Sequence, residues 1–359
     1  MHLRRVDFEK DVLYIILRKT RQVYFMINVA LDAMGGDNAP GEIIKGAIDA
    51  VNERKDIRIY LCGRMDDMQQ ELAHYSYNAE QITLVDAPDV IETGEAPVMA
   101  VRRKKDSSIV KGLHLVKEGT CDAFVSAGSS GAILVGGQFI VGRIKGVERP
   151  PLAPLLPTEK GVSLLIDCGA NVDARPSHLV QFAKMGSVYM EHVLGVSNPK
   201  VAIVNIGAEE EKGNLLVKET FPLLKNCPDI NFVGSIEARD IPRGDADVIV
   251  CEAFVGNVIL KLYEGVGRTF IKLIKSGLMS SLRGKIGGAL IKPALKKTLK
   301  SFDSSEYGGA PLLGLNGLVV KTHGSSTAKE VKNSIIQCVT FKEQDINRKI
   351  DNKINIPEE

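Results

Sequence analysis

The sequence predicts an α/β fold, an open and mostly parallel sheet with helices on both faces, in three layers. Strand-like and helix-like patterns alternate from residue 27 almost to the C-terminus, which is the order expected of parallel strands joined by crossover helices. Strand-like runs such as VIVC at 248–251 are apolar throughout, as in strands that helices cover on both faces. No internal repeat interrupts this order.

The predicted strands are short apolar runs rich in β-branched residues. In chain order they are 27–32, 57–62, 82–85, 122–126, 162–167, 200–206, 230–233, 247–251 and 317–320. The predicted helices carry apolar residues three or four positions apart, the spacing of one buried helix face. They are 41–53, 65–74, 107–118, 130–142, 177–194, 211–226, 255–276 and 325–340.

Composition excludes several classes of protein. The chain has 359 residues, 44% of them hydrophobic and 25% charged, which are ordinary values for a globular protein. Its formal net charge of +2 argues neither for nor against a nucleic-acid partner, and we expect none. Its 6 cysteines include no C-x-x-C pair, which argues against a zinc ribbon or a disulfide framework and favours free thiols in a reducing compartment. No apolar run approaches the roughly 18 residues that span a bilayer. We expect a cytoplasmic protein.

The first 25 residues differ from the rest, so we divide the chain into an extension (1–25), an α/β domain (26–344) and a polar C-terminal tail (345–359). The apolar run at 12–17 is too short for a signal peptide. Met26 stands directly before the first predicted strand. Our hypothesis is that translation starts at Met26; an additional helix in 1–25 remains the open alternative.

Glycine and small polar residues follow the predicted strands. The first such loop is LDAMGGDNAP (31–40), where glycines permit a tight turn and Asp37 or Asn38 can cap the next helix. The second is SAGSSGA (126–132), where Ser129 and Ser130 offer hydroxyl groups near the main chain. Each loop alone is compatible with an ordinary turn.

Further loops of this kind are DCGAN (167–171), EAFVGN (252–257), EYGGAP (306–311) and KTHGSS (321–326). Lys184 lies further along the helix that follows the 167–171 loop. In parallel sheets, ligands bind at the carboxyl ends of the strands. We therefore expect these loops to line a single crevice that binds a phosphate-like anion.

Absent motifs narrow the chemistry further. The sequence has no P-loop, no G-x-S-x-G, no H-E-x-x-H and no G-x-G-x-x-G after the first strand, and no dense aspartate cluster for a metal. We expect neither a cofactor nor a metal. Among the histidines, His323 and His178 are the functional candidates, because each lies beside a predicted loop. Cys168 and Cys251 end strands, and we expect them to be buried.

Residues 265–302 contain basic residues but no Asp or Glu. Apolar residues recur there three or four apart, and the glycines at 284, 287 and 288 predict a break between two helices. We predict a protruding basic amphipathic hairpin that contacts a membrane or an acidic carrier protein. The contact residues would be Leu278, Met279, Leu282, Arg283, Lys285 and Lys292. A solvated helix packed on the core is the open alternative.

Taken in order, these segments resemble the bacterial phosphate acyltransferases, the PlsX family. The resemblance rests on DAMGGDNAP (32–40), ETGEAP (92–97), SAG (126–128), DCGAN (167–171), QFAKMG (181–186), FVGN (254–257) and 306–317. It covers 26 to about 340 and leaves out residues 1–25. The family pattern differs at three places, with Asn-Thr at 129–130, Ala at 151 and Asp-Gly at 252–253.

The resemblance implies transfer of a long-chain acyl group from acyl carrier protein to inorganic phosphate. The product, an acyl phosphate, would then serve a downstream glycerol-3-phosphate acyltransferase in membrane phospholipid synthesis. It also implies a homodimer and a fold similar to phosphotransacetylase and isocitrate dehydrogenase. Peripheral membrane association is expected from the basic amphipathic segment 265–302.

For the reaction we hypothesise direct attack of phosphate on the thioester, without an acyl-enzyme. Backbone N–H groups and Ser129, Ser130 or Asn171 would stabilise phosphate or the tetrahedral oxyanion, Lys184 would neutralise phosphate and His323 would protonate the thiolate. The other expected phosphate-site residues are Gly35, Gly36, Asp37, Asn38, Gly128, Asn257, Gly324 and Ser325. Two alternatives remain open: a phosphotransacetylase-like enzyme acting on coenzyme A thioesters, and a non-catalytic membrane-surface scaffold.

Overall fold

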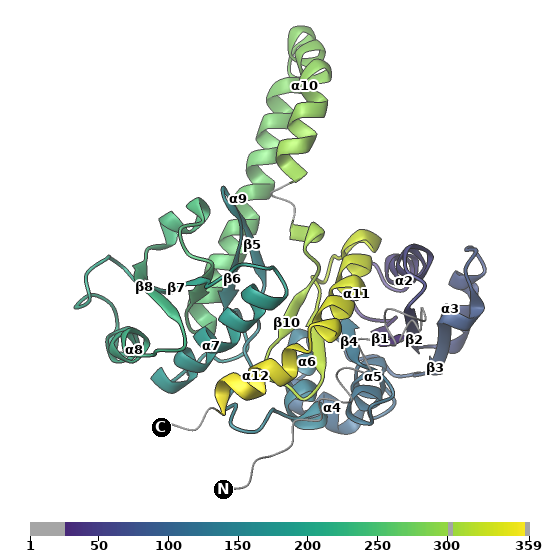
Figure 1. Cartoon of the computed structure of the whole chain (residues 1–359). Helices are drawn as coiled ribbons and strands as arrows, with labels where there is room; N and C mark the ends of the chain where they lie inside the picture. The colour runs from purple at the N-terminus through teal and green to yellow at the C-terminus, as the bar shows by residue number, and fades with distance from the viewer. Residues whose placement is uncertain (1–25, 301–303, 356–359) are drawn as a thin grey trace, which may run out of the picture.

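The computed structural model describes residues 26–300 and 304–355, which form two mostly parallel sheets with helices on both faces (Figure 1). The first sheet has the strand order β10-β11-β4-β1-β2-β3. β10 is antiparallel to β11, and the other pairs are parallel. The strands are β1 (Ile27–Asp32), β2 (Ile57–Gly63), β3 (Ile82–Asp86), β4 (Ala123–Ser126), β10 (Ala310–Leu312) and β11 (Leu318–Lys321).

The second sheet has the order β5-β6-β9-β7-β8, with β5 antiparallel to β6 and the other pairs parallel. Its strands are β5 (Leu155–Thr158), β6 (Gly161–Ile166), β7 (Lys200–Val204), β8 (Asn231–Ile236) and β9 (Val248–Val250). The predicted α/β class is thus confirmed, but the strands divide into two sheets rather than one.

The two sheets meet along a seam beside their antiparallel edge strands. Leu152, just before β5, forms an isolated bridge with Leu312 of β10. On either side of this bridge, Ala153 N–H donates to Pro311 O at 3.0 Å and Leu313 N–H donates to Pro151 O at 3.1 Å. One bridge and two backbone hydrogen bonds therefore join the edges of the two sheets along this seam.

Helices cover both sheets, except that α10 and the outer part of α9 stand away from the strands. Their bounds are α2 (Gly41–Glu53), α3 (Met65–Leu72), α4 (Pro97–Arg103), α5 (Ser108–Lys117), α6 (Ser130–Gly136), α7 (Pro176–His192), α8 (Leu215–Lys225), α9 (Ala253–Met279), α10 (Leu282–Lys300), α11 (Ala328–Glu343) and α12 (Ile346–Ile354). A π-helical turn, 137–141, continues α6. Short 3-10 turns are Ala79–Gln81, Ala238–Arg243 and Ser304–Glu306.

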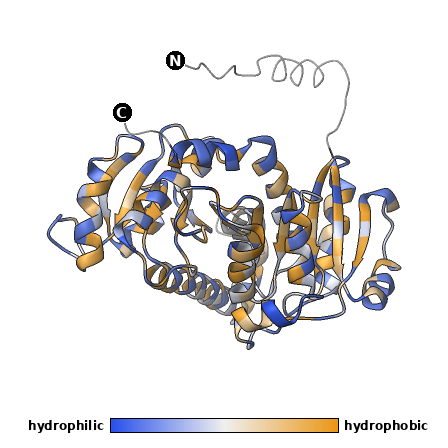
Figure 2. Cartoon of the chain, turned by 90° about the horizontal axis from the view of Figure 1, so that it is seen from below, coloured by the Kyte–Doolittle hydropathy of each residue, from blue (hydrophilic) through white to orange (hydrophobic). Residues whose placement is uncertain are grey.

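The strands supply most of the core. Val29, Ile59 and Val125 of the first sheet, and Leu164 and Val248 of the second, are almost completely buried. Each such side chain contributes roughly 1.5–3 kcal/mol through burial. In Figure 2 the strands are mostly coloured hydrophobic, whereas the surrounding helices alternate between the two colours.

Several elements differ from the prediction. The prediction lacks β5 and β10, because both strands are short and include a proline, Pro157 or Pro311, which weakens a strand pattern. It also lacks α4, a helix of only 7 residues. The predicted polar tail, 345–359, contains α12. Its Ile346 and Ile350 are buried and lie on one face of the helix, a spacing that the polar composition of the segment conceals.

Helices α9 and α10 pack against each other and project from the body of the molecule (Figure 1). The break between them lies at Ser280 and Ser281 rather than at the glycines, which lie within α10. The Ser280 hydroxyl donates to Gly277 O at 2.7 Å, and Ser281 Oγ accepts the Gly284 N–H at 3.0 Å. These serine contacts end one helix and start the next, because they satisfy backbone groups that lack helical partners.

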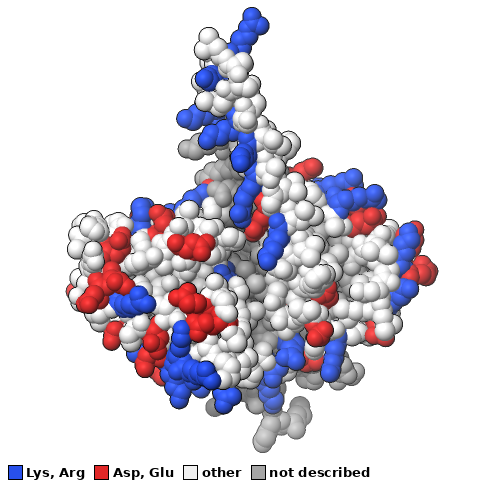
Figure 3. Space-filling model, turned by 180° about the vertical axis from the view of Figure 1, so that it is seen from behind, with Lys and Arg blue, Asp and Glu red and all other residues white. Residues whose placement is uncertain are grey.

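Residues 265–300 are called the helical hairpin below. Met279, Leu282, Arg283, Lys285 and Lys292 are exposed on it. Leu278 is half-buried, with its side chain facing Gly288 of α10. Basic side chains line the hairpin in Figure 3, and its outer part shows no acidic ones. α10 packs on α9 and stands away from the sheets, unlike the alternative of a helix packed on the core.

No helix among the described residues is long and apolar enough to cross a bilayer. The hypothesis about residues 1–25 lies outside the described residues.

Candidate active site

A cavity of about 930 Å³ opens between the carboxyl ends of the two sheets. Loops after β6 and β11 line it, together with the start of α6, the residues around the start of β5, the residues leading into β10 and the first turns of α9. This volume lies within the range of pockets that bind small molecules. Its position is the one that the parallel-strand rule predicts for ligands.

The structure brings several of the predicted loops together here. Ser130, Asn257, His323, Gly324 and Ser325 line the cavity. They come from the start of α6, the first turns of α9 and the loop after β11, which are far apart in the sequence. These predicted residues therefore share one site.

The loop after β1 lies behind the cavity wall and supports it. The Asp37 N–H donates to Gly324 O at 2.7 Å. Asn38 Nδ2 donates to the carbonyl oxygens of Ser325 and Ser326, each at 3.2 Å. Asp37 and Asn38 thus position the 323–326 loop rather than line the cavity.

Glycines allow these loops to approach each other closely. A Cβ atom on Gly35 would lie 2.6 Å from Gly128 N and 2.3 Å from a carboxylate oxygen of Asp32. Gly36 has φ +96°, and a Cβ there would lie 2.8 Å from Gly324 O. Gly35, Gly36 and Gly128 are therefore needed for the contact between loops.

Asp32 joins the β1 and β4 loops from below. It is buried, its Oδ2 accepts a 2.6 Å hydrogen bond from Ser126 Oγ, and its Oδ1 accepts the Met34 N–H at 3.1 Å. Ser126 Oγ also accepts the Gly128 N–H at 3.0 Å. Burial raises the pKa of the Asp32 carboxyl, although these hydrogen bonds act in the opposite direction.

Asp167 organises the loop after β6 in a similar way. Its Oδ1 accepts the Leu152 N–H at 2.9 Å, and its Oδ2 accepts both the N–H and Nδ2 of Asn171 at 2.8 Å. Burial raises the pKa of this carboxyl. Asn171 Nδ2 also donates to Pro150 O at 3.0 Å, so this amide shapes the loop and does not line the cavity.

Lys184 does not reach the cavity. It lies eight residues after Pro176, the first residue of α7, which is about 12 Å along the helix axis. Its Nζ pairs with Asp229 Oδ2 at 2.9 Å. The structure therefore gives no support to the prediction that Lys184 neutralises phosphate.

The two neighbouring serines differ in their surroundings. Ser129 is buried at the start of α6, where its Oγ accepts the Ala132 N–H at 3.4 Å. Ser130 is exposed and lines the cavity. Of the two hydroxyls, that of Ser130 is the one placed to meet a ligand.

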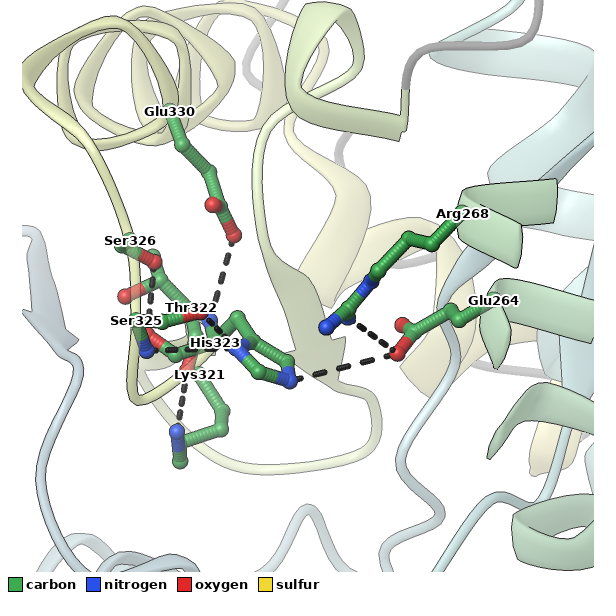
Figure 4. Close-up of polar contacts among 8 residues, drawn as sticks. All are labelled: Glu264, Arg268, Lys321, Thr322, His323, Ser325, Ser326 and Glu330. Atoms are coloured by element: carbon green, nitrogen blue, oxygen red, sulfur yellow. Dashed lines mark hydrogen bonds and ion pairs between the residues drawn. The ribbon is translucent and has the colours of Figure 1, made fainter. Parts of the chain in front are cut away.

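His323 lies between α9 and α11 (Figure 4). Its Nδ1 accepts the Ser325 N–H at 3.1 Å, and the Ser325 hydroxyl lies 2.7 Å from the same atom. Because a backbone N–H only donates, the neutral ring carries its proton on Nε2. Nε2 faces Glu264 of α9, whose Oε2 is 3.9 Å away. The ring therefore presents a donor to this side of the cavity.

Cationic groups that the sequence analysis did not single out also line the cavity. Arg268 pairs with Glu264 at 3.1 Å, and Lys329 pairs with Glu306 at 2.8 Å. Lys321, the last residue of β11, donates to Ala127 O at 3.4 Å and also to Thr322 O. Burial lowers the pKa of Lys321 to about 8. Lys321 could have been found from the sequence, because it directly follows a predicted strand and begins the KTHGSS motif.

The two long helices that begin near the cavity do not offer open N-termini. Glu252 accepts the Phe254 and Val255 N–H groups of α9 at 2.6 and 2.9 Å. Glu42 accepts the Ala328 N–H of α11 at 2.6 Å. An anion in the cavity therefore meets side-chain cations rather than these helix ends.

Apolar residues also line the cavity, and they are called the apolar wall below. Its hydrophobic lining residues are Leu134, Leu152, Pro154, Leu155, Val172, Ala253, Phe254 and Leu260. The cavity thus combines a cationic, hydrogen-bonding wall with a surface suited to a hydrocarbon chain.

The structure gives less support to a cysteine nucleophile, to a role for His178 and to a metal site. Cys168 lines the cavity but is buried, as is Cys251, and burial raises the pKa of both thiols well above the ordinary value. Both cysteines are therefore poor nucleophiles. His178 is buried and pairs with Glu148 at 3.0 Å, away from the cavity lining. Among residues 26–300 and 304–355, no group of His, Cys, Asp or Glu is arranged to hold a metal ion.

Comparison with known proteins places this geometry in context. Residues 27–349 match the family described as "Fatty acid synthesis protein". The chain is 52% identical over 328 residues to the phosphate acyltransferases of Clostridium perfringens and Clostridium novyi, a match that spans 91% of this chain and 97% and 98% of theirs.

Solved structures show the same fold at lower identity. The EutD phosphotransacetylase from Staphylococcus aureus matches with a TM-score of 0.57 and 17% identity, over 93% of this chain and 98% of that one. A phosphotransacetylase from Streptococcus pyogenes matches with a TM-score of 0.58 and 18% identity, over 92% and 99%.

Proposed function

Because the chain belongs to the fatty acid synthesis protein family that includes the bacterial phosphate acyltransferases, we propose that it transfers a long-chain fatty acyl group from acyl carrier protein to inorganic phosphate. It is an acyltransferase by family. The product is an acyl phosphate, which a downstream glycerol-3-phosphate acyltransferase consumes in membrane phospholipid synthesis.

The mixed cationic and apolar lining of the cavity is the strongest support for this proposal. Lys321, His323 and Ser130 offer N–H and O–H donors on the polar wall, where phosphate binds. The apolar wall receives the hydrocarbon chain next to the thioester carbonyl. Each methylene group that leaves water contributes about 0.8 kcal/mol, which favours a long chain over an acetyl group.

Phosphate attacks the thioester carbonyl directly in this mechanism. Binding both reactants in one cavity removes much of the entropy cost of their encounter. The Nε2–H of His323, the Ser130 hydroxyl and the Asn257 amide donate to the developing oxyanion. Because burial raises the pKa of the Cys168 thiol, this cysteine is a poor nucleophile, and the mechanism has no acyl-enzyme. The neutral His323 ring has one proton, and losing that proton would leave an anion. We therefore assign His323 the role of stabilising the oxyanion rather than protonating the thiolate.

The tip of the helical hairpin is the proposed membrane contact. Met279 and Leu282 are exposed there, with exposed fractions of 55% and 75%. Arg283, Lys285 and Lys292 are exposed on the same hairpin. Apolar insertion combined with about 1 kcal/mol per basic residue near an anionic leaflet gives reversible, peripheral binding. The same positive charge attracts an acidic carrier protein.

A homodimer is proposed from the exposed side of α9. Five large apolar residues lie at steps of three or four along this helix, namely Val258, Leu262, Val266, Phe270 and Leu273. All are about half exposed or more. An apolar stripe of this length on an amphipathic helix indicates a partner surface, and the same helix of a second copy is a matching one.

Trapping with hydroxylamine tests the proposed reaction, because acyl phosphates form hydroxamates. The chain is incubated with palmitoyl-acyl carrier protein and phosphate, and separately with acetyl- and palmitoyl-coenzyme A. We expect phosphate-dependent hydroxamate from the carrier-protein substrate. Hydroxamate from coenzyme A thioesters alone would assign a phosphotransacetylase-like activity, and none from any substrate would favour the scaffold.

A further inference from the structure

Lys321 lies where three loops converge. It is the last residue of β11 and pairs in register with Ser126 at the end of β4. Its Nζ donates to Ala127 O in the β4 loop at 3.4 Å and to Thr322 O. Lys321 also interacts electrostatically with three carboxylates, those of Glu330 on α11, Asp32 at the end of β1 and Asp37 in the loop after β1. The predicted phosphate loops thus enclose this lysine rather than Lys184.

The charge of Lys321 is not neutralised by a close partner. Within the described part of the chain it makes no ion pair within 4.0 Å, whereas Arg268 and Lys329 in the same cavity each have a carboxylate partner. Two of its three ammonium hydrogens are directed to backbone carbonyls. One N–H remains for a ligand in the cavity.

Resting on the proposed phosphate acyltransferase activity, we propose that Lys321 is a catalytic residue that protonates the departing thiolate and regains its proton from the attacking phosphate.

The step balances without another reactant. An oxygen of hydrogen phosphate forms a bond to the thioester carbon, and the carbon–sulfur bond breaks with its electron pair going to sulfur. The Lys321 ammonium gives a proton to that sulfur, and the hydrogen of the phosphate passes to the Lys321 amine. The products are acyl phosphate and the free thiol of the carrier.

The surroundings of Lys321 suit this role. Burial lowers its pKa to about 8, against the opposing effect of Glu330, Asp32 and Asp37. A thiol has an unperturbed pKa of about 8.5, so the proton moves between groups of similar affinity. Arg268 holds its proton too tightly for this transfer, since the pKa of arginine lies above about 12. His323 Nδ1 accepts the Ser325 N–H, so the neutral ring has one proton, on Nε2, which it donates to the oxyanion.

Lys321→Arg separates proton transfer from charge, because arginine keeps the charge but does not release a proton. Release of carrier-protein thiol is followed with palmitoyl-acyl carrier protein and phosphate between pH 6 and 9. We expect kcat to fall about 100-fold or more, with a smaller change in the KM for phosphate. We also expect the titration near pH 8 in kcat to disappear. The control is Lys332→Arg, because Lys332 lies on α11, pairs with Glu53 of α2 at 2.7 Å and does not line the cavity.

A thioester with a better leaving group provides the second arm. An aryl thiolate leaves without protonation, so the ratio of wild-type to Lys321→Arg rates should shrink to within about tenfold on palmitoyl thiophenol. Wild-type kcat and an unchanged pH profile in Lys321→Arg, or an equal loss on both thioesters, would overturn the proposal. Absence of phosphate-dependent thiol release in the wild type would instead refute the proposed function itself.

Discussion

Glu264 of α9 faces His323, with its Oε2 3.9 Å from His323 Nε2, and the same carboxylate oxygen pairs with Arg268 at 3.1 Å. The stem of the projecting hairpin therefore reaches the wall of the cavity. Helix α9 thus links Met279, at the proposed membrane contact, with a charge beside the proposed oxyanion donor, whereas α10 carries Leu282 and the basic contact residues (Figures 1 and 4).

Replacing Glu264 tests this relationship. Glu264→Gln removes the charge that holds Arg268 and faces the His323 ring, so we expect kcat to fall about tenfold, equivalent to roughly 1.4 kcal/mol in the barrier. The KM for acyl carrier protein should change little. Steady-state kinetics on both substrates measure the two effects, with Glu210→Gln, a surface partner of Lys225, as the control. An unchanged kcat would show that Glu264 has no part in positioning the ring.

Gly36 tests the packing between the loops. Gly36→Ala places a Cβ at positive φ and 2.8 Å from Gly324 O, so we expect a loss of about 3 kcal/mol in unfolding free energy. Gly119→Ala is the matched control: its φ is also positive, at +76°, but no atom lies within 4 Å of the added Cβ. Strain alone costs about 1–2 kcal/mol there. Urea unfolding measures both variants, and equal losses would contradict the close contact between loops.

The lowered pKa of Lys321 has a consequence for stability. A lysine whose folded-state pKa is about 8 favours folding above its unfolded pKa of about 10.4, and this contribution is lost as the pH falls through 8. The difference in unfolding free energy between Lys321→Met and the wild type should therefore shift by roughly 3 kcal/mol between pH 7 and pH 10.5, with the variant relatively more stable at pH 7. Urea unfolding at both values measures it. A constant difference would indicate that the ammonium is solvated.

The hairpin tip is tested with lipid vesicles. Met279→Glu combined with Leu282→Glu replaces exposed apolar side chains with carboxylates, so binding to phosphatidylglycerol vesicles should weaken about 100-fold. Leu223→Glu, at an exposed position on α8, is the control. Co-sedimentation at low and high salt measures binding. Equal binding by both variants would place the membrane contact elsewhere.

The apolar stripe of α9 is tested by sedimentation. Leu262→Glu combined with Val266→Glu introduces charges at its centre, and we expect the wild type to sediment as a dimer and this variant as a monomer. Leu215→Glu, at an exposed position on α8, should remain dimeric. A variant that stays dimeric would exclude α9 as the interface.

The sequence predicted the fold class and much of the site because both follow from local patterns. Small residues after parallel strands must gather at one edge, and so Ser130, Asn257 and Gly324 were found together. The outcome for Lys184 shows the limit of this reasoning, because which face of a helix points inward depends on its packing. Its side chain turned to Asp229 instead.

Lys321 was missed for a related reason. A lysine at the end of a strand resembles a solvated residue, and its burial results from loops almost 200 and 300 positions earlier in the sequence, around Ala127 and Asp32. Likewise, Asn171 looked like an oxyanion donor, whereas its amide is held by Asp167 and Pro150. Such hydrogen-bond partners are set by tertiary contacts and are not visible in local sequence.

A crystal structure with bound orthophosphate shows whether the converging loops hold phosphate beside an incoming acyl thioester. We predict a phosphate within hydrogen-bond distance of Lys321 Nζ and the Ser130 hydroxyl, on the polar wall of the cavity. Phosphate bound outside this cavity, with Lys321 turned away from it, would contradict the account.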